Sequence, residues 1–267
     1  MARADPDLTQ RFMDFELEIY RAASERVADH DWGAAILNPS LPLVWDASLV
    51  VITKPGIDAT EVAEVAGEVL DGAGMSHRTV LSGSDGVGRD LAPGLERLGW
   101  EIERAIYMVW SGEPDHEPNA TASEVRHAEI EDLRSRLIRS DLPMATPQKR
   151  ETVEQLLEWD RRVGTAAGDR WFVADDDHGN HASTCRLLVR EGRSLGQVED
   201  VGTLLEARER GLARAVTLTA ARASVANGHE VTFLGALADD WPQVMYARLG
   251  FTEVGSNWTF RRPPPGR

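Results

Sequence analysis

The sequence predicts an α+β protein of two lobes, each with a central mixed β-sheet flanked by helices. Helical and extended patterns alternate along the 267 residues, a length that suits one large or two smaller domains. Near the middle, the polar segment 111–119 carries two prolines and is the best linker in the chain. A short strand, a helix, a glycine turn and a further strand occur in the same order on both sides of it.

Composition excludes several classes of function. The formal net charge is −15 and the isoelectric point is near 4.9, so the surface repels phosphate backbones and we expect no nucleic-acid partner. No apolar run reaches the roughly 20 residues that span a bilayer, and residues 1–6 show no signal-peptide core. The single cysteine, Cys185, fits a reducing compartment. We therefore expect a cytoplasmic protein without a membrane partner.

In the first half, apolar periodicity predicts three helices and three extended segments. Phe12, Phe15 and Ile19 recur at helical spacing, and Asp58 is placed to cap a helix start. Gly99 ends the third helix, and Pro93 has to lie in its first turn. The expected helices are 8–27, 59–71 and 90–98, and the extended segments are 41–52, 79–81 and 100–110.

In the second half, the same reasoning predicts a longer series of elements. Turn residues at 175–180 and 191–193 separate the strands of a meander. Asn227 and Gly228 end the most apolar helix, and Gly250 ends the last one. The expected strands are 125–127, 171–174, 182–189, 195–204, 231–234 and 251–260, and the expected helices are 130–140, 152–163, 211–226 and 242–248.

The two halves also share a short local pattern. Residues 95–102 (LERLGWEI) match residues 246–253 (YARLGFTE) in the order of helix, glycine and strand. A repeated order of elements indicates duplication of a supersecondary unit. The alternative is that helix–glycine–strand is a common connection that arose twice.

The segment 208–213 (RERGLA) follows a predicted strand and opens a predicted helix. The first turn of a helix has unpaired N–H groups and a partial positive charge, both of which favour a phosphate group. Gly211 and Ala213 allow an anion to approach the backbone, and Arg208, Arg210 and Arg214 add positive charge. Taken alone, the pattern also fits a plain strand-to-helix turn with solvated arginines.

With a second motif the chain resembles the GCN5-related N-acetyltransferase (GNAT) superfamily. The acetyl-CoA loop of that family, Gln/Arg-x-x-Gly-x-Gly/Ala, matches Arg208, Gly211 and Ala213. Its later motif, Tyr-x-x-Leu-Gly-Phe, matches residues 246–251. The resemblance covers residues 122–262 and includes the order of the elements. It implies acetyl transfer from acetyl-CoA to a primary amine, here expected to belong to a small molecule.

The resemblance also implies where acetyl-CoA lies. In the family, two parallel strands splay apart and the pantetheine arm pairs with exposed backbone of one of them, as an added strand does. The residues expected to hold acetyl-CoA are Val201, Gly202, Thr203, Arg208, Glu209, Arg210, Gly211, Leu212, Ala213, Arg214 and Tyr246. We expect no metal ion in the site.

The reaction requires a base for the ammonium proton and an acid for the leaving thiolate. The resemblance assigns the acid to Tyr246, although a packing role for its ring is the alternative. Glu199 and Asp200 adjoin the motif strand and are the candidate bases, with a slight preference for Glu199. On a regular strand they face opposite sides, so that only one faces the cleft. Both are also compatible with an ordinary acidic surface.

The first half lacks the corresponding signals. Segment 53–58 contains no Arg-x-x-Gly-x-Ala, Asp58 at a helix start repels phosphate, and Leu95 occupies the place of Tyr246. We therefore expect a degenerate GNAT-like lobe (1–112), a linker (113–121) and a catalytic GNAT domain (122–267). The degenerate lobe completes the sheet, walls off the substrate side or helps to form the acceptor pocket. Whether the protein is a monomer or a homodimer stays open.

Two other functions fit the same motifs. A longer acyl-CoA in place of acetyl-CoA gives an acyltransferase of different specificity. A protein that binds acyl-CoA without catalysis is a sensor or scaffold, and it is the main alternative to an enzyme.

Overall fold

A computed structural model describes residues 6–112, 114–142 and 149–264 of the chain. The first half contains α1 (Pro6–Ala23), β1 (Arg26–His30), β2 (Gly33–Leu37), β3 (Leu49–Ile52), α2 (Ala59–Gly72), β4 (Arg78–Ser82), α3 (Asp85–Arg97) and β5 (Glu101–Trp110). The second half contains β6 (Ser123–Val125), α4 (His127–Asp141), α5 (Lys149–Ala167), β7 (Arg170–Asp175), β8 (His181–Val189), β9 (Leu195–Thr203), α6 (Leu212–Ala226), β10 (Val231–Leu237), α7 (Pro242–Arg248) and β11 (Phe251–Arg262).

The predicted mixed architecture is confirmed, and both halves contribute to one sheet. The strand order is β1-β2-β3-β4-β11-β5-β10-β9-β8-β7-β6. From its hairpin onward, each half has the order strand, strand, strand, helix, strand, helix, strand. The proposed linker, whose residue 113 is outside the described residues, falls between β5 and β6. Residues 1–5, part of the segment expected to carry no signal-peptide core, also lie outside the described residues.

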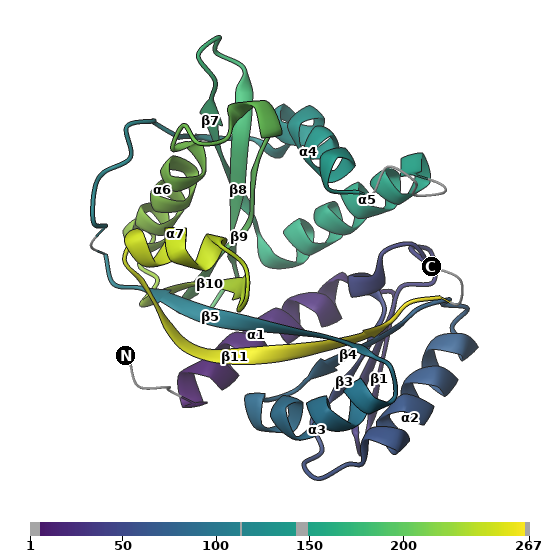
Figure 1. Ribbon diagram of the computed structural model, residues 1–267. Helices are drawn as coiled ribbons and strands as arrows, with labels where there is room; N and C mark the ends of the chain where they lie inside the picture. The colour runs from purple at the N-terminus through teal and green to yellow at the C-terminus, as the bar shows by residue number, and fades with distance from the viewer. Residues whose placement is uncertain (1–5, 113, 143–148, 265–267) are drawn as a thin grey trace.

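The last strand of each half inserts into the sheet of the other. β11 pairs antiparallel with both β4 and β5, so it lies between two strands of the first half. β5 pairs with both β10 and β11, so it lies between two strands of the second half. Figure 1 shows β5 and β11 running side by side across the middle of the molecule. We refer to this arrangement as the strand exchange.

Helix α1 packs against strands of both halves. The apolar stripe that predicted it is buried, and its Phe12 ring stacks on Phe233 of β10 with a centroid distance of 4.0 Å. Phe12 also meets the ring of Tyr107 of β5 edge-on, at 5.6 Å. Such contacts stabilise beyond the burial of apolar area. The first helix of the chain is therefore part of the core between the lobes.

Several predictions for the first half were wrong. Of the expected extended segment 41–52, only Leu49–Ile52 is a strand, because a 3-10 turn occupies Trp45–Ala47. The hairpin of β1 and β2 was not predicted, and helix α1 ends at Ala23 instead of reaching residue 27. Helix α3 begins at Asp85, because the Ser84 hydroxyl accepts a hydrogen bond from the Val87 N–H and caps the helix. Pro93 consequently lies inside α3 and not in its first turn.

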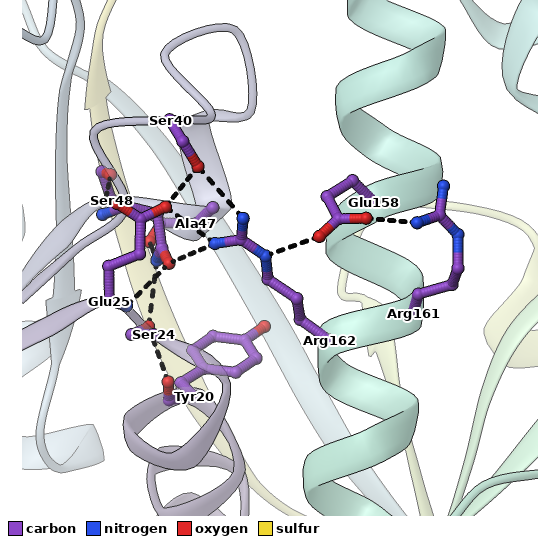
Figure 2. Close-up of polar contacts among 10 residues, drawn as sticks. Tyr20, Ser24, Glu25, Ser40, Ala47, Ser48, Glu158, Arg161 and Arg162 are labelled. Atoms are coloured by element: carbon purple, nitrogen blue, oxygen red, sulfur yellow. Dashed lines mark hydrogen bonds and ion pairs between the residues drawn. The ribbon is translucent and has the colours of Figure 1, made fainter.

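A cluster of hydrogen bonds joins the lobes near the end of α1 (Figure 2). Arg162 of α5 donates to Glu25 at 2.8 Å and to Ser40 at 3.0 Å, both in the first half. Arg162 also donates to the side-chain oxygen of the fully buried Asn38, at 3.4 Å. These contacts, which we call the Arg162 clamp, hold the segment between β2 and β3 against the second lobe.

Among the described residues, no helix is both long and apolar enough to cross a membrane.

Candidate active site

Strands β9 and β10 separate part-way along their length. They pair in parallel from Val231 with Leu195 to Phe233 with Gln197. Beyond this point β10 pairs with β5, on its other side. The rest of β9, from Val198 to Thr203, continues to pair with β8 but has no pairing to β10. An unpaired strand edge offers N–H and C=O groups to an added chain, as predicted for this stretch.

A β-bulge lies just beyond the point of separation. Asp200 has a φ of 53°, which is left-handed, and the β8–β9 register shifts between Thr184 and Arg186. Because a bulge inserts one extra residue, Glu199 and Asp200 do not alternate as on a regular strand. The expectation that only one of them faces the cleft is wrong. Both contact Arg186, with N–O distances of 3.1 Å for Glu199 and 2.7 Å for Asp200.

The bulge is supported by a network of buried charges. Arg134 of α4 pairs with Asp160 of α5 at 2.7 Å and with Asp200 at 3.1 Å. The guanidinium groups of Arg134 and Arg186 both lie over the Trp171 ring, at 5.4 and 5.7 Å from its centroid. Such buried pairs hold a geometry in place, and removing one partner is costly. The network therefore fixes the bulged backbone.

The two candidate bases differ in their electrostatic surroundings. Burial would raise the pKa of Asp200, but the nearby Arg186 and Arg134 outweigh burial and hold the pKa below its usual value. Burial also acts on Glu199, where Arg186 opposes it and Asp200 reinforces it, and the result is a raised pKa. A base for an ammonium group needs a raised pKa. The electrostatics therefore favour Glu199 over Asp200.

Two adjoining cavities lie beside the bulge. One, of about 380 Å³, is lined by Glu199, Asp200, Val201 and Gly202 and by residues of α4 and α5. The other, of about 300 Å³, lies between the lobes and is lined by Glu199 together with residues of α1, β5 and β10. Both cavities include Tyr20, Asp46 and Glu199. We call the two together the inter-lobe cleft.

The predicted phosphate loop has the expected strand–turn–helix setting. Residues Glu209 and Gly211 have φ values of 64° and 79°, and α6 begins at Leu212, directly after them. The first turn of α6 contains no acidic residue. A Cβ on Gly211 would meet no atom within 4 Å, so the space outside the turn is open. The helix start can therefore accept an anion.

The arginines of this loop have partners in the protein. Arg210 pairs with Asp177 of the β7–β8 turn at 2.8 Å, and Arg214 donates to the carbonyl of His116 at 2.8 Å. Arg208 donates to the carbonyl of Thr203, at 3.3 Å. Asp177 therefore balances the charge of Arg210, while Arg208 and Arg214 are bonded to neutral carbonyl groups.

Tyr246 lies on α7, where it is 7% exposed. Its ring packs edge-on against Phe251 at 6.1 Å. Burial raises the pKa of its hydroxyl, and the neighbouring Cys185 and Asp240 act in the same direction. A phenol with a raised pKa retains its proton, which a general acid requires. Its ring also packs into the core, so the packing role and the acid role are compatible.

One residue of the cleft was missed by the sequence analysis. Glu16 of α1 accepts hydrogen bonds from Tyr107 at 2.5 Å and from Gln197 at 2.6 Å. Burial raises the pKa of Glu16 to about 8, and Glu199 reinforces that shift. The available signal was its position. Glu16 follows Phe12 by four residues and lies on the apolar stripe of α1, where a carboxylate is out of place.

The corresponding region of the first lobe is closed. Strands β3 and β4 pair up to their last residues, Ile52 and Ser82, and the Gly83 N–H donates to the Ile52 carbonyl at 2.7 Å. At the start of α2, the Asp58 carboxylate accepts the Thr60 N–H at 2.7 Å. Leu95, in the place of Tyr246, is fully buried.

Comparison with known proteins identifies the fold. No protein-family model matches the chain, and no curated protein is recognisably similar in sequence. The chain is similar in structure to a functionally unknown conserved protein from Staphylococcus epidermidis ATCC 12228, with a TM-score of 0.70, 13% identity, and coverage of 91% of this chain and 95% of that one.

Two further structures bear the name of a family. A GCN5-related N-acetyltransferase from Kribbella flavida has a TM-score of 0.66 and 19% identity, covering 97% of this chain and 96% of that one. A tandem GNAT protein from the clavulanic acid biosynthesis pathway, solved without AcCoA, has a TM-score of 0.56 and 14% identity, covering 100% and 98%. The chain thus has the GNAT fold in its tandem form, as predicted.

Proposed function

We propose that this chain, with its tandem GNAT fold, transfers the acetyl group of acetyl-CoA to the primary amine of a small molecule. One observation carries the proposal. The unpaired edge of β9 leads at one end to the open start of α6 and adjoins, at its bulge, a cleft lined with carboxylates. This arrangement suits a phosphate-bearing acyl donor on one side and an amine on the other.

The residues present fit the acyl donor. The N–H groups at the start of α6 and the neighbouring Arg208, Arg210 and Arg214 suit the phosphates. The unpaired backbone of Val201, Gly202 and Thr203 suits the amide groups of a pantetheine arm. Bound acetyl-CoA supplies an acyl thioester that an unprotonated amine can attack, with release of a thiolate.

The protein supplies the proton transfers that this reaction needs. Glu199, with its raised pKa, accepts the proton that the substrate ammonium must lose. In this proposal the Val201 N–H, next to the bulge, donates to the carbonyl oxygen as negative charge develops there. Tyr246 donates its hydroxyl proton to the leaving thiolate, and the second proton that the amine nitrogen loses as the amide forms restores the Tyr246 hydroxyl. Asp200 stays ionised between its two arginines and holds the bulge in place.

A panel of primary amines with acetyl-CoA, followed by free-thiol release, tests the proposal. We expect amine-dependent thiol release in the wild type and a loss of that activity in Glu199→Gln, without loss of acetyl-CoA binding. Binding of acetyl-CoA without turnover of any amine would instead favour the sensor or scaffold. Faster turnover with a longer acyl-CoA would favour the other acyltransferase.

A further inference from the structure

The lining of the inter-lobe cavity has an unusual charge distribution. Four carboxylates and one guanidinium face the space of about 300 Å³ between the lobes: Glu16, Asp46, Glu103, Glu199 and Arg261. Arg261 pairs with Asp46 at 2.7 Å and with Glu103 at 2.9 Å. Arg261 is shared by two carboxylates, so one negative charge is left over there. At the other end Arg186 pairs with Glu199 at 3.1 Å, and Glu16, whose pKa is raised to about 8 by burial, becomes charged when a cation binds beside it. The cavity is therefore suited to a ligand with more than one positive charge.

The carboxylates form two groups along β5. Glu103, Ala105 and Tyr107 alternate along this strand and so lie on one face of it. The inner group is Glu16, bonded to Tyr107, with Glu199 as its electrostatic neighbour. The outer group is Asp46 and Glu103, joined by Arg261. Tyr107 lies four positions after Glu103 on the extended strand, a span of about 13 Å.

The inner group has an unfilled hydrogen-bonding position. Gln197 is 2% exposed and lines the cavity, and its Nε2 donates to Glu16. Within the part of the chain that the structure describes, its Oε1 has no hydrogen-bond partner. A buried amide oxygen without a donor is costly. An ammonium group beside Glu16 would supply that donor.

Between the two groups, aliphatic side chains share the lining with two polar ones, Asn257 opposite Ala105 and Thr259 opposite Glu103. Leu49 and Leu81 line the cavity from the first lobe, and Ala236 and Leu237 line it from β10. Aliphatic walls between two acidic ends match a chain of methylene groups between two ammonium groups. A second charged group on the ligand would therefore lie at the outer end, where Asp46 and Glu103 are part-exposed.

We infer that the acceptor is a linear diamine or polyamine, with one ammonium group held by Glu16 and Glu199 and another held by Asp46 and Glu103. This inference rests on the proposed function, because it names the amine that the same site acetylates. It assigns the choice of acceptor largely to the first lobe, which supplies Glu16, Asp46 and Glu103. The inner ammonium group, beside Glu199, is the one that reacts.

Matched ligands test the inference by calorimetry. The probes are α,ω-diamines of increasing chain length, each compared with the n-alkyl monoamine of the same length. We expect the best diamine to bind at least about 30-fold more tightly than its monoamine. Affinities within about threefold of each other at every length would overturn the inference.

Variants locate the second charge site. In the double variant Asp46→Asn with Glu103→Gln, the diamine advantage should fall to within about threefold. Glu68→Gln, on the exposed face of α2, removes one charge elsewhere and should keep the full advantage. An advantage that persists in the double variant contradicts the assignment. If the double variant does not fold, Glu103→Gln alone, checked by circular dichroism, should still reduce the advantage.

Thiol release with acetyl-CoA separates this inference from the proposed function. Tight diamine binding without any thiol release would support the two-charge site and count against the enzyme. Thiol release with monoamines as fast as with diamines, together with equal binding, would support the enzyme and overturn the two-charge site.

Discussion

The two lobes share one order of strands and helices, yet their central parallel strands behave differently. In the first lobe β3 and β4 stay paired to their ends, and the helix that follows β3 begins beside Asp58. In the second lobe β9 leaves β10 at a bulge, and the helix that follows β9 begins without an acidic residue. A single bulge and the charge at one helix start therefore separate a closed lobe from one with an open strand edge.

The strands beside these sites are also built differently. β3 is apolar and fully buried, with the sequence LVVI. β9 carries Glu199 and Asp200 at the corresponding end, and both require Arg186 as a partner. The difference shows that an open strand is held by charge where a closed one is held by apolar packing. Five predictions follow from this contrast, from the largest expected effect to the smallest.

Asp200→Asn should destabilise the protein by about 3–5 kcal/mol, because it leaves Arg134 and Arg186 buried with one partner fewer. Urea unfolding measures this change. Glu124→Gln, which breaks an exposed pair with Arg170 in the same lobe, should cost less than about 1 kcal/mol. Equal losses in the two variants would show that the charge network does not hold the bulge.

Ala213→Glu should weaken acetyl-CoA binding about 100-fold or more, because it places a carboxylate at the start of α6. It gives the second lobe the acidic helix start of the first. The matched control is Thr60→Glu at the same position of α2. Calorimetric titration with acetyl-CoA should show unchanged affinity for Thr60→Glu. A loss of affinity in Thr60→Glu would mean that the phosphates bind at α2 of the first lobe, contrary to the proposal.

Tyr246→Phe should lower kcat about 10- to 100-fold, because the leaving thiolate loses its proton donor. Acetyl-CoA affinity and the thermal midpoint should stay close to those of the wild type, because the ring remains. Steady-state kinetics with the best amine measures the effect. Unchanged turnover would leave Tyr246 with a packing role, as Leu95 has in the first lobe.

Arg162→Met should destabilise the protein by about 1–2 kcal/mol, because it removes the clamp between the lobes. Arg161, the next residue on α5, pairs with Glu158 of the same helix, as Arg162 also does (Figure 2). Arg161→Met should therefore cost under about 0.5 kcal/mol in the same urea titration. A similar cost for both would mean that the clamp does not couple the lobes.

Glu16 should make stability depend on pH. Its pKa is raised from 4.5 to about 8 by burial, with Tyr107, Gln197 and Glu199 as the groups that face it. The folded state favours its protonated form, so its contribution to stability is complete below about pH 4.5 and is lost as the pH rises through 8. Thermal midpoints of the wild type should fall relative to Glu16→Gln between pH 5 and 9. If the difference in thermal midpoint between the wild type and Glu16→Gln stayed constant over this pH range, the raised pKa of Glu16 would be contradicted.

Local patterns in the sequence account for most elements and for both motifs. The helices around Phe12, Asp58 and Gly211 follow from periodicity, capping and turn residues, and each is confirmed. The β1–β2 hairpin was not predicted because all five residues of β1 are exposed. The β1 sequence, RVADH, does not alternate between apolar and polar residues. The predicted range for helix α3 was too short at its start, because Gly86, Gly88 and Pro93 weaken the helical pattern of the sequence.

The rest depended on contacts that no local pattern contains. The bulge at Asp200 needs the charges of α4 and α5, which lie far away in sequence. The sequence pattern of a strand does not specify which strands it pairs with, so the positions of β5 and β11 in the sheet could not be predicted from it. Glu16 joins the cleft because α1 packs between the lobes. The surroundings of Glu16, a residue of the first half, thus depend on contacts with the second half.

The strand exchange has a consequence for how the chain is made. β4 and β5 leave the ribosome early, but the strand that lies between them is β11, which pairs Arg262 with Arg78. The first lobe therefore cannot reach its final form while the second is still being synthesised. Nascent β4 and β5 present unpaired edges throughout that interval. Both lobes finish folding together, so a stop codon before β11 would damage the half of the protein that was translated first.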